Sequence, residues 1–155
     1  RSRGLGDVYK RQPMNRQNQM EKRMRKTESL VINNPVLLNE HEDEADILYI
    51  GFISTKGAIG EGAERLERHG VKVNTMHIRQ LHPFPKDIVQ QAINKASKVI
   101  VAEHNYQGQL SSILKMNTQV NDKLVNQTKY DGKPFLPYEI EEKGLEIAKE
   151  LKELV

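Results

Sequence analysis

The sequence predicts an α/β domain with an open, mainly parallel sheet of three to five strands flanked by helices. Apolar runs of strand length recur along the chain, segments with helical periodicity stand between them, and Gly, Pro or Asp residues mark their junctions. A nearly continuous apolar run is typical of a strand that is covered on both faces of a parallel sheet. Repeated strand–helix–strand units indicate such a sheet.

The first strand is predicted for residues 47–53, where the sequence ILYIGFI is apolar almost throughout. The first helix follows it and ends at Gly70, because glycine readily adopts the left-handed conformation found after a helix C-terminus. A spacing of three or four residues places the apolar residues of this helix on one face. These residues are Ile59, Gly62, Ala63 and Leu66.

Two further strands and two further helices are predicted downstream. Residues 71–78 form the second strand, and residues 98–103 form the third. Pro85 opens the second helix, where its missing N–H removes no helical hydrogen bond. The expected buried stripe of the second helix is Ile88, Val89, Ala92, Ile93 and Ala96, and that of the third helix is Leu110, Ile113 and Leu114.

The C-terminal region completes the predicted sheet. Residues 124–130 are a candidate edge strand, which ends at the turn-forming pair Asp131-Gly132. Pro137 is expected to open a final helix whose apolar residues share a face, namely Ile140, Ile147, Leu151 and Leu154.

Three segments of the chain differ in composition. We interpret residues 1–12 as non-native, because residues 7–12 (DVYKRQ) are the translation of GATGTGTATAAGAGACAG, which resembles the transposon-end adapter of sequencing libraries. Residues 13–45 are predicted to be a linker with a possible helix, which Pro35 stops, and an acidic run at 40–44 that we interpret as solvated rather than metal-binding. The domain proper is predicted for residues 46–155.

Charge and composition argue against several classes of protein. The net charge is +3, but residues 1–26 hold nine of the 24 basic residues and only two of the 21 acidic ones. Without residues 1–12 the two kinds are equal in number, so charge does not favour a nucleic-acid partner. The chain has no cysteine, which excludes a disulfide scaffold and a cysteine-held zinc or iron–sulfur site within it. Because no apolar run approaches the about 18 residues of a membrane span and no signal sequence follows the basic N-terminus, we expect a cytoplasmic protein without a membrane partner.

Ligands of open α/β sheets usually lie at the carboxyl ends of the strands, where three loops are expected. The first loop is Ser54, Thr55, Lys56 and Gly57. Ser54 or Thr55 can cap the following helix, and the N–H groups of its first turn, together with Lys56, could bind an anion or contact a partner. A plain helix cap is the favoured interpretation, because the loop matches neither a P-loop nor a dinucleotide-binding fingerprint.

The other two loops are candidate interface loops. In residues 79–85, prolines on both sides of Phe84 fix the direction of its ring, which favours a plug in a core or an interface over catalysis by His82. Residues 103–109 are dense in hydrogen-bonding side chains. Glu103 and His104 could form an acid–base pair, but neighbouring strand residues point to opposite faces, so polar packing or an interface is favoured. The interface candidates are His82, Phe84, His104, Asn105, Tyr106 and Gln109, and we nominate no catalytic residue and no metal ligand.

Several segments occur in the order that a known family has. They are 46–48 (DIL), 51–59 (GFISTKGAI), 71–74 (VKVN), 77–85 (HIRQLHPFP), 101–110 (VAEHNYQGQL) and 129–135 (KYDGKPF). Together they resemble the C-terminal part of the α subunit of bacterial 2-oxoacid:ferredoxin oxidoreductases, which is a transketolase C-terminal-like domain. The resemblance covers residues 46–155. The chain departs from the family at Gly60 and Gly62, inside the first helix, and at His104 and Gln107.

The resemblance implies a truncated fragment of a complex that oxidatively decarboxylates a 2-oxoacid, such as pyruvate or 2-oxoglutarate, to an acyl-CoA. The complex uses thiamine diphosphate, Mg²⁺, coenzyme A and an iron–sulfur cluster, and it passes electrons to ferredoxin. The implied partners are a β subunit, which holds the diphosphate end of the cofactor and the cluster, and the upstream domains of the same α subunit. The fragment itself is expected to bind none of these cofactors, to be inactive alone and to serve assembly.

Two alternatives stay open from the sequence. The chain could be the equivalent domain of another thiamine enzyme, such as a transketolase or a 2-oxoacid dehydrogenase. It could also be a self-standing anion-binding or scaffold module, which Ser54, Thr55 and Lys56 would favour.

Overall fold

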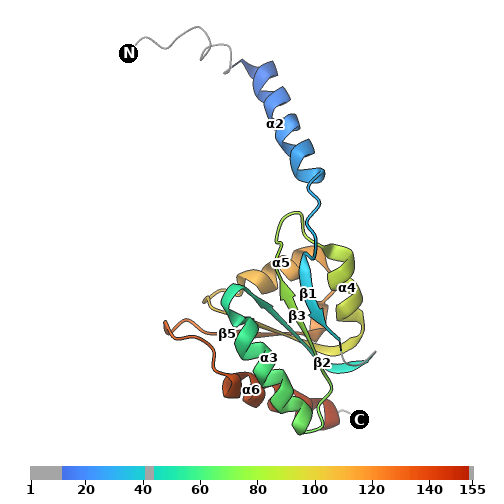
Figure 1. The fold of residues 1–155 in the computed structure, drawn as a ribbon, viewed down its shortest axis with the longest axis vertical. Coiled ribbons are helices and arrows are strands. Elements are labelled where there is room, and N and C mark those ends of the chain that lie inside the picture. Colours follow the sequence, from blue (N-terminus) through green and yellow to red (C-terminus); the bar gives the residue numbers. More distant parts are fainter. Residues whose placement is uncertain (1–11, 41–43, 154–155) are drawn as a thin grey trace. The chain divides into compact units, whose positions relative to one another are not determined.

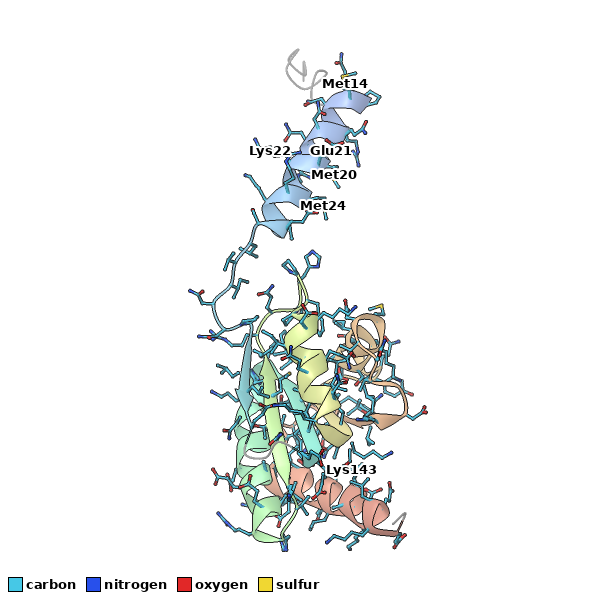
Figure 2. The ribbon with its side chains drawn as sticks, turned by 90° about the vertical axis from the view of Figure 1, so that its right-hand side faces the viewer. Met14, Met20, Glu21, Lys22, Met24 and Lys143 are labelled. Atoms are coloured by element: carbon cyan, nitrogen blue, oxygen red, sulfur yellow. The ribbon has the colours of Figure 1, made fainter. Side chains whose placement is uncertain are left out.

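The computed structural model describes residues 12–40 and 44–153, which belong to two compact units, residues 1–33 and 34–155. The described part of the first unit contains helix α2 (Pro13–Glu28), which buries none of its residues. Its methionines Met14, Met20 and Met24 are exposed (Figure 2). The possible helix in the predicted linker is therefore present. The residues interpreted as non-native lie outside the described part of the chain, apart from residue 12, and so do residues 41–43 of the acidic run.

The second unit is built on a five-stranded sheet with the strand order β1-β3-β2-β4-β5. Strands β2, β3, β4 and β5 run parallel, whereas β1 is antiparallel to β3 at one edge. The open, mainly parallel sheet is confirmed, and the C-terminal edge strand is where the sequence predicts it. The strands are β1 (Val36–Asn39), β2 (Ala45–Phe52), β3 (Val73–Ile78), β4 (Ala96–Glu103) and β5 (Leu124–Thr128).

Helices cover both faces of the sheet (Figure 1). Helices α3 (Lys56–Arg68) and α6 (Pro137–Glu153) pack on one face, and α4 (Lys86–Asn94) and α5 (Gln109–Asn117) pack on the other. Short 3₁₀ helices, η1 (Ile53–Thr55) and η2 (Asn121–Lys123), precede α3 and β5. Within the described residues, no helix is both long enough and apolar enough to cross a membrane.

Two details of the predicted elements are corrected. Residues 36–39, which the sequence assigns to the linker, form β1, because three apolar residues between Pro35 and a polar stretch become a strand only when β3 supplies hydrogen bonds. Helix α4 begins at Lys86 with Pro85 at its N-cap position, and Ile88 of its predicted buried stripe is exposed. The other described residues that the sequence assigns to that stripe are buried.

The strand β2 explains why the first apolar run is continuous. Ile47 and Tyr49 face the core under α3 and α6, whereas Leu48 and Ile50 face the core under α4 and α5. The hydroxyl of Tyr49 donates a hydrogen bond to the backbone oxygen of Ile140 at 2.7 Å, so one polar atom ties β2 to α6. Burial raises the pKa of Tyr49 well above its usual value, which keeps this hydroxyl a donor.

Helices α3 and α6 approach each other through glycines. A Cβ added to Gly62 would lie 2.6 Å from both Cβ and Cγ2 of Ile140, and one added to Gly144 would collide with Leu66. Each glycine therefore admits a large side chain from the opposite helix. A Cβ added to Gly60, two residues from Gly62 on α3, would meet no atom of the described residues within 4 Å.

The two glycines of α3 form a matched pair for a stability measurement. Gly62→Ala should lower the free energy of unfolding by about 1–3 kcal/mol, the usual cost of overpacking a core. Gly60→Ala should raise it by about 0.5–1 kcal/mol, because alanine is the better helix former and space is open there. Urea denaturation of the 155-residue chain measures both changes. Equal effects of the two substitutions would contradict the packing described.

Candidate functional site

The carboxyl ends of β2 and β4 meet where the winding of the sheet reverses. From β2 the chain passes through α3 to β3 on one side, and from β3 it returns through α4 to β4 on the other side. Crevices at such a reversal are the usual ligand sites of open α/β sheets. Two hollows lie here and share Ser54 and His104, one of about 490 Å³ and one of about 260 Å³.

We call the larger hollow the carboxyl-edge cleft. The loops after β2, β4 and β5 supply its lining, which is Ser54, His104, Lys129, Tyr130, Gly132, Lys133 and Pro134. The smaller hollow is more apolar and lies against α5 and residues 79–85. Its lining includes Phe52, Ile53, Leu81, Leu110 and Ile113.

Glu103 caps helix α5. Its side chain is buried, and its two oxygens accept hydrogen bonds from the N–H of Leu110 at 2.7 Å, the N–H of Ser111 at 3.2 Å and the hydroxyl of Ser111 at 2.7 Å. Asn105 donates to the same carboxylate at 2.7 Å and accepts from the N–H of Gly108 at 2.7 Å. A carboxylate at a helix N-terminus satisfies N–H groups that have no partner within the helix. Glu103 is thus committed to positioning the loop after β4.

His104 points the other way and links three segments. Its Nε2 accepts a hydrogen bond from the N–H of Phe135 at 3.1 Å, so the other ring nitrogen, Nδ1, carries the proton and can donate to Ser54 Oγ at 3.3 Å. The ring also packs on Phe135, with 4.9 Å between ring centroids. The opposite directions expected for Glu103 and His104 are found, and the two side chains do not act as an acid–base pair.

A clamp between Lys129 and Glu139 holds the loop after β5. The ammonium lies 2.7 Å from both carboxylate oxygens of Glu139, and it also donates to the backbone oxygen of Pro134 at 3.0 Å. Glu139 accepts a third hydrogen bond from the N–H of Leu136 at 2.7 Å. Hydrogen bonding by Lys129 lowers the pKa of Glu139, and hydrogen bonding by Glu139 raises the pKa of Lys129. The charge of Lys129 is therefore compensated inside the cleft.

The four residues of the first predicted loop do not converge on one point. Thr55 is buried, and its hydroxyl accepts from the N–H of Phe52 at 3.0 Å instead of capping α3. The cause is the 3₁₀ turn η1, which places this hydroxyl back toward β2. Ser54 lines the carboxyl-edge cleft, whereas Lys56 lines a groove on another side of α3 and Gly57 is exposed.

The loop at residues 79–85 plugs the core. Phe84 is half-buried and packs with Phe52 and Leu81 against the core under α4 and α5, whereas His82 is exposed. The side-chain amide of Gln80 donates to the backbone oxygen of Pro83, which braces the loop from inside. The packing of Phe84 agrees with a plug in the core, and its predicted role at an interface stays a prediction. His82 touches neither hollow at the carboxyl edge.

Three exposed apolar or aromatic side chains stand at the same edge of the sheet. Tyr106 and Tyr130 are 73% and 66% exposed and make an edge-to-face pair with centroids 4.9 Å apart. Ile53 is 71% exposed and has a φ of 56°. A β-branched residue is rare in this left-handed region because its side chain clashes with the backbone. Sequence reasoning missed Tyr130 and Ile53, since only the β4–β5 pairing and the turn η1 bring them to this edge.

Comparison with known proteins gives consistent matches. Residues 45–138 match the family model of the pyruvate:ferredoxin oxidoreductase core domain II. The chain is 32% identical over 131 residues to the 2-oxoacid:ferredoxin oxidoreductase subunit alpha of Saccharolobus solfataricus, which covers 83% of this chain and 21% of the relative. It is 38% identical over 97 residues to the 2-oxoglutarate oxidoreductase subunit KorA of Mycobacterium tuberculosis, covering 63% of this chain and 14% of the relative. The chain thus spans about a fifth or less of the length of these relatives.

The chain is also similar to solved structures of an oxidoreductase and a transketolase. The 2-oxoglutarate:ferredoxin oxidoreductase from Magnetococcus marinus, with 2-oxoglutarate, coenzyme A and succinyl-CoA bound, aligns with a TM-score of 0.76 and 30% identity. The alignment covers 89% of this chain and 24% of that one. A split-gene transketolase aligns with a TM-score of 0.60 at 11% identity, which shows a shared fold alone. The predicted transketolase C-terminal-like fold is confirmed.

Replacing Ile53 with glycine should raise the free energy of unfolding by up to about 1.5 kcal/mol. Relief of the left-handed conformation is worth about 1–2 kcal/mol, and the greater backbone freedom of glycine in the unfolded chain costs about 0.5–1 kcal/mol. Urea denaturation measures the difference. Ile53→Val keeps the branched side chain and should give no gain. A loss of stability in Ile53→Gly would show that the side chain is held by contacts within the chain.

Replacing Glu139 with glutamine should remove part of the acid sensitivity of the fold. Because the pKa of Glu139 is lowered in the folded chain, its carboxylate stabilises the fold above the ordinary pKa of 4.5, and that contribution is lost as the pH falls through the lowered pKa. The difference in unfolding free energy between parent and Glu139→Gln should be full above the ordinary pKa of 4.5 and shrink as the pH falls through the lowered pKa. Glu142→Gln, at an exposed position of the same helix, is the control. A difference that does not change with pH would contradict the clamp.

Proposed function

Because this chain belongs to the pyruvate:ferredoxin oxidoreductase core domain II family, we propose that it is the assembly domain in the C-terminal part of the α subunit of a 2-oxoacid:ferredoxin oxidoreductase. The complete enzyme oxidatively decarboxylates a 2-oxoacid to an acyl-CoA and passes the electrons to ferredoxin. The names of the relatives support this proposal, since they are α subunits of 2-oxoacid:ferredoxin oxidoreductases or a 2-oxoglutarate oxidoreductase subunit. The partners are then the upstream domains of the same α subunit, a β subunit and, for the complex, ferredoxin.

The residues of this chain do not fit the cofactors of such an enzyme. Iron–sulfur clusters are held by cysteine thiolates, and the chain has none. Thiamine diphosphate enters with Mg²⁺, which needs oxygen ligands, and the described residues bring no three His, Asp or Glu side chains together as a metal site. On this proposal, thiamine diphosphate, Mg²⁺, the cluster and coenzyme A are held by the other parts of the complex.

The observation that carries the assembly role is the organised and apolar carboxyl edge. Glu103 and the clamp of Lys129 with Glu139 fix the loops after β4 and β5 through internal hydrogen bonds. Those loops nevertheless present an exposed tyrosine pair to the outside. Tyrosine is enriched in protein interfaces, because it buries a large area with few rotatable bonds and keeps one polar atom. A rigid loop with exposed aromatics is suited to contact another protein surface.

The direct experiment uses the complete complex. The α subunit encoded at the same locus is produced with its β subunit, and reduction of ferredoxin is measured with a 2-oxoacid and coenzyme A. We expect turnover, and we expect deletion of residues 46–155 to abolish co-purification of the subunits. Normal assembly and turnover without these residues would overturn the assembly role. Dependence on a lipoyl-bearing partner in place of ferredoxin would indicate a different thiamine enzyme.

The tyrosine pair provides a finer test of the edge. The double substitution Tyr106→Ala and Tyr130→Ala should weaken assembly of the complex by about 10-fold or more, as expected when interface aromatics are truncated. The stability of the 155-residue chain should change little, because both side chains are exposed. Tyr138→Ala on α6 is the control, since Tyr138 is also exposed but lines neither hollow at the carboxyl edge. Sedimentation of the purified subunits measures the affinity, and equal affinity in both variants would contradict the proposed interface.

A further inference from the structure

A third hollow lies between the edge strand β1, its neighbour β3 and helix α3. We call it the edge groove. It has a volume of about 350 Å³, and Leu37, Leu38, Asn39, Lys56, Ile59, Gly60, Thr75, Met76 and His77 line it. In the register of the two strands Leu37 lies opposite His77, and Asn39 lies opposite Thr75. These four side chains therefore share one face of the sheet, the face on which α3 and α6 cover the inner strands.

Helix α3 presents an unfilled position to this groove. Glycine inside a helix costs about 0.5–1 kcal/mol relative to alanine, so a helical glycine usually has a packing reason. Gly62 has one in Ile140, as shown above. A Cβ on Gly60 would meet no atom of the described residues within 4 Å. Packing inside the described chain thus accounts for Gly62 and leaves Gly60 open to an approach from outside.

A buried polar atom in the same groove lacks a hydrogen bond. Nδ1 of His77 is inaccessible to solvent and has no hydrogen-bond partner among the described residues. An unsatisfied buried polar group costs about 1–3 kcal/mol. Burial, with smaller contributions from the positive charges of Lys56 and Arg79, lowers the pKa of His77, so the ring is neutral near pH 7. His77 therefore adds no positive charge of its own to the groove.

Charge and chain length define what fits the groove. Lys56 lines the groove, and Lys56 and Arg79 are the cations that act on His77, so the surroundings of the groove are positively charged. Its lining is also partly apolar, because it includes leucine, isoleucine and methionine side chains. The chain amounts to 21% of one relative's length and 24% of a solved homologue's chain, so most of an α subunit of that size lies outside it. The polypeptide also enters this domain through β1, which is one wall of the groove.

From these observations we propose that the edge groove seats an apolar segment from the upstream part of the same α subunit, with an acidic side chain or helix C-terminus directed at Lys56 and Arg79. The segment packs its backbone against Gly60 and its apolar side chains against Leu37, Leu38 and Ile59. This inference rests on the proposed function, since it takes the chain to be one part of a longer α subunit. It adds a second contact surface, distinct from the carboxyl edge, and assigns it a partner.

The experiment uses the absence of cysteine from the chain. Gly60→Cys introduces a single small thiol at an open position, and the rate of its reaction with a maleimide is measured by peptide mass spectrometry. We compare the 155-residue chain with the complete α subunit from the same locus, both without the β subunit. Gln91→Cys, at an exposed position of α4 on the opposite face, is the matched control. Thermal unfolding checks that both variants keep the parent fold.

The thiol of Gly60→Cys should react at least about 10-fold more slowly in the complete α subunit than in the short chain, because a packed segment must open before the reagent enters. The control thiol should react at similar rates in both. Equal rates for Gly60→Cys, equal protection of the control, or protection of the short chain that grows with its own concentration would each overturn the proposal.

Ferredoxin reduction by the unsubstituted complex separates this inference from the proposed function. Turnover together with a reactive thiol in Gly60→Cys would overturn the groove proposal and leave the proposed function standing. Protection of the thiol in the α subunit, when the complex of that α subunit with its β subunit does not reduce ferredoxin, would overturn the proposed function. It would leave the proposed intramolecular contact standing.

Discussion

Burial of strand β2 on both faces is the constraint on which the rest of the structure depends. Side chains from this strand enter both cores in alternation, so helices must cover each face of the sheet. Burying a large apolar side chain is worth about 1.5–3 kcal/mol, and Ile47, Leu48 and Ile50 of β2 are all fully buried. With β2 in the centre, the chain must wind to β3 on one side and to β4 on the other. That winding brings the ends of β2 and β4 together and creates the crevice that Ser54 and His104 share.

The loops at this crevice are held from within. Glu103 accepts hydrogen bonds from the first turn of α5, and His104 accepts one from the loop before α6. Lys129 donates to Glu139. The arrangement fixes the direction of exposed aromatic side chains, and fixed aromatics lose little conformational entropy when a partner covers them. These features support the proposed assembly role.

The sequence allowed the sheet, its order of helices and most of the core to be predicted, because hydrophobic periodicity records burial directly. It could not predict β1, whose three apolar residues acquire strand structure only from pairing with β3. It placed Ser54, Thr55 and Lys56 in one loop, but the 3₁₀ turn η1 sends their side chains to three different surroundings. Tyr130 could not be predicted because only tertiary structure brings it beside Tyr106, and Ile53 could not because the turn η1 exposes a residue that the sequence assigns to a buried strand. The glycines of α3 look alike in sequence, and only their neighbours distinguish Gly62 from Gly60.

Hydrogen–deuterium exchange gives the most direct test that this domain is an assembly module. Backbone exchange is compared between the 155-residue chain and the complete, turning-over complex of α and β subunits. The account predicts slower exchange in the complex at the loops around 53–57, 104–109 and 129–136, with little change in the central strands, which are already buried in the chain. Unchanged exchange at all three loops in an active complex would contradict it.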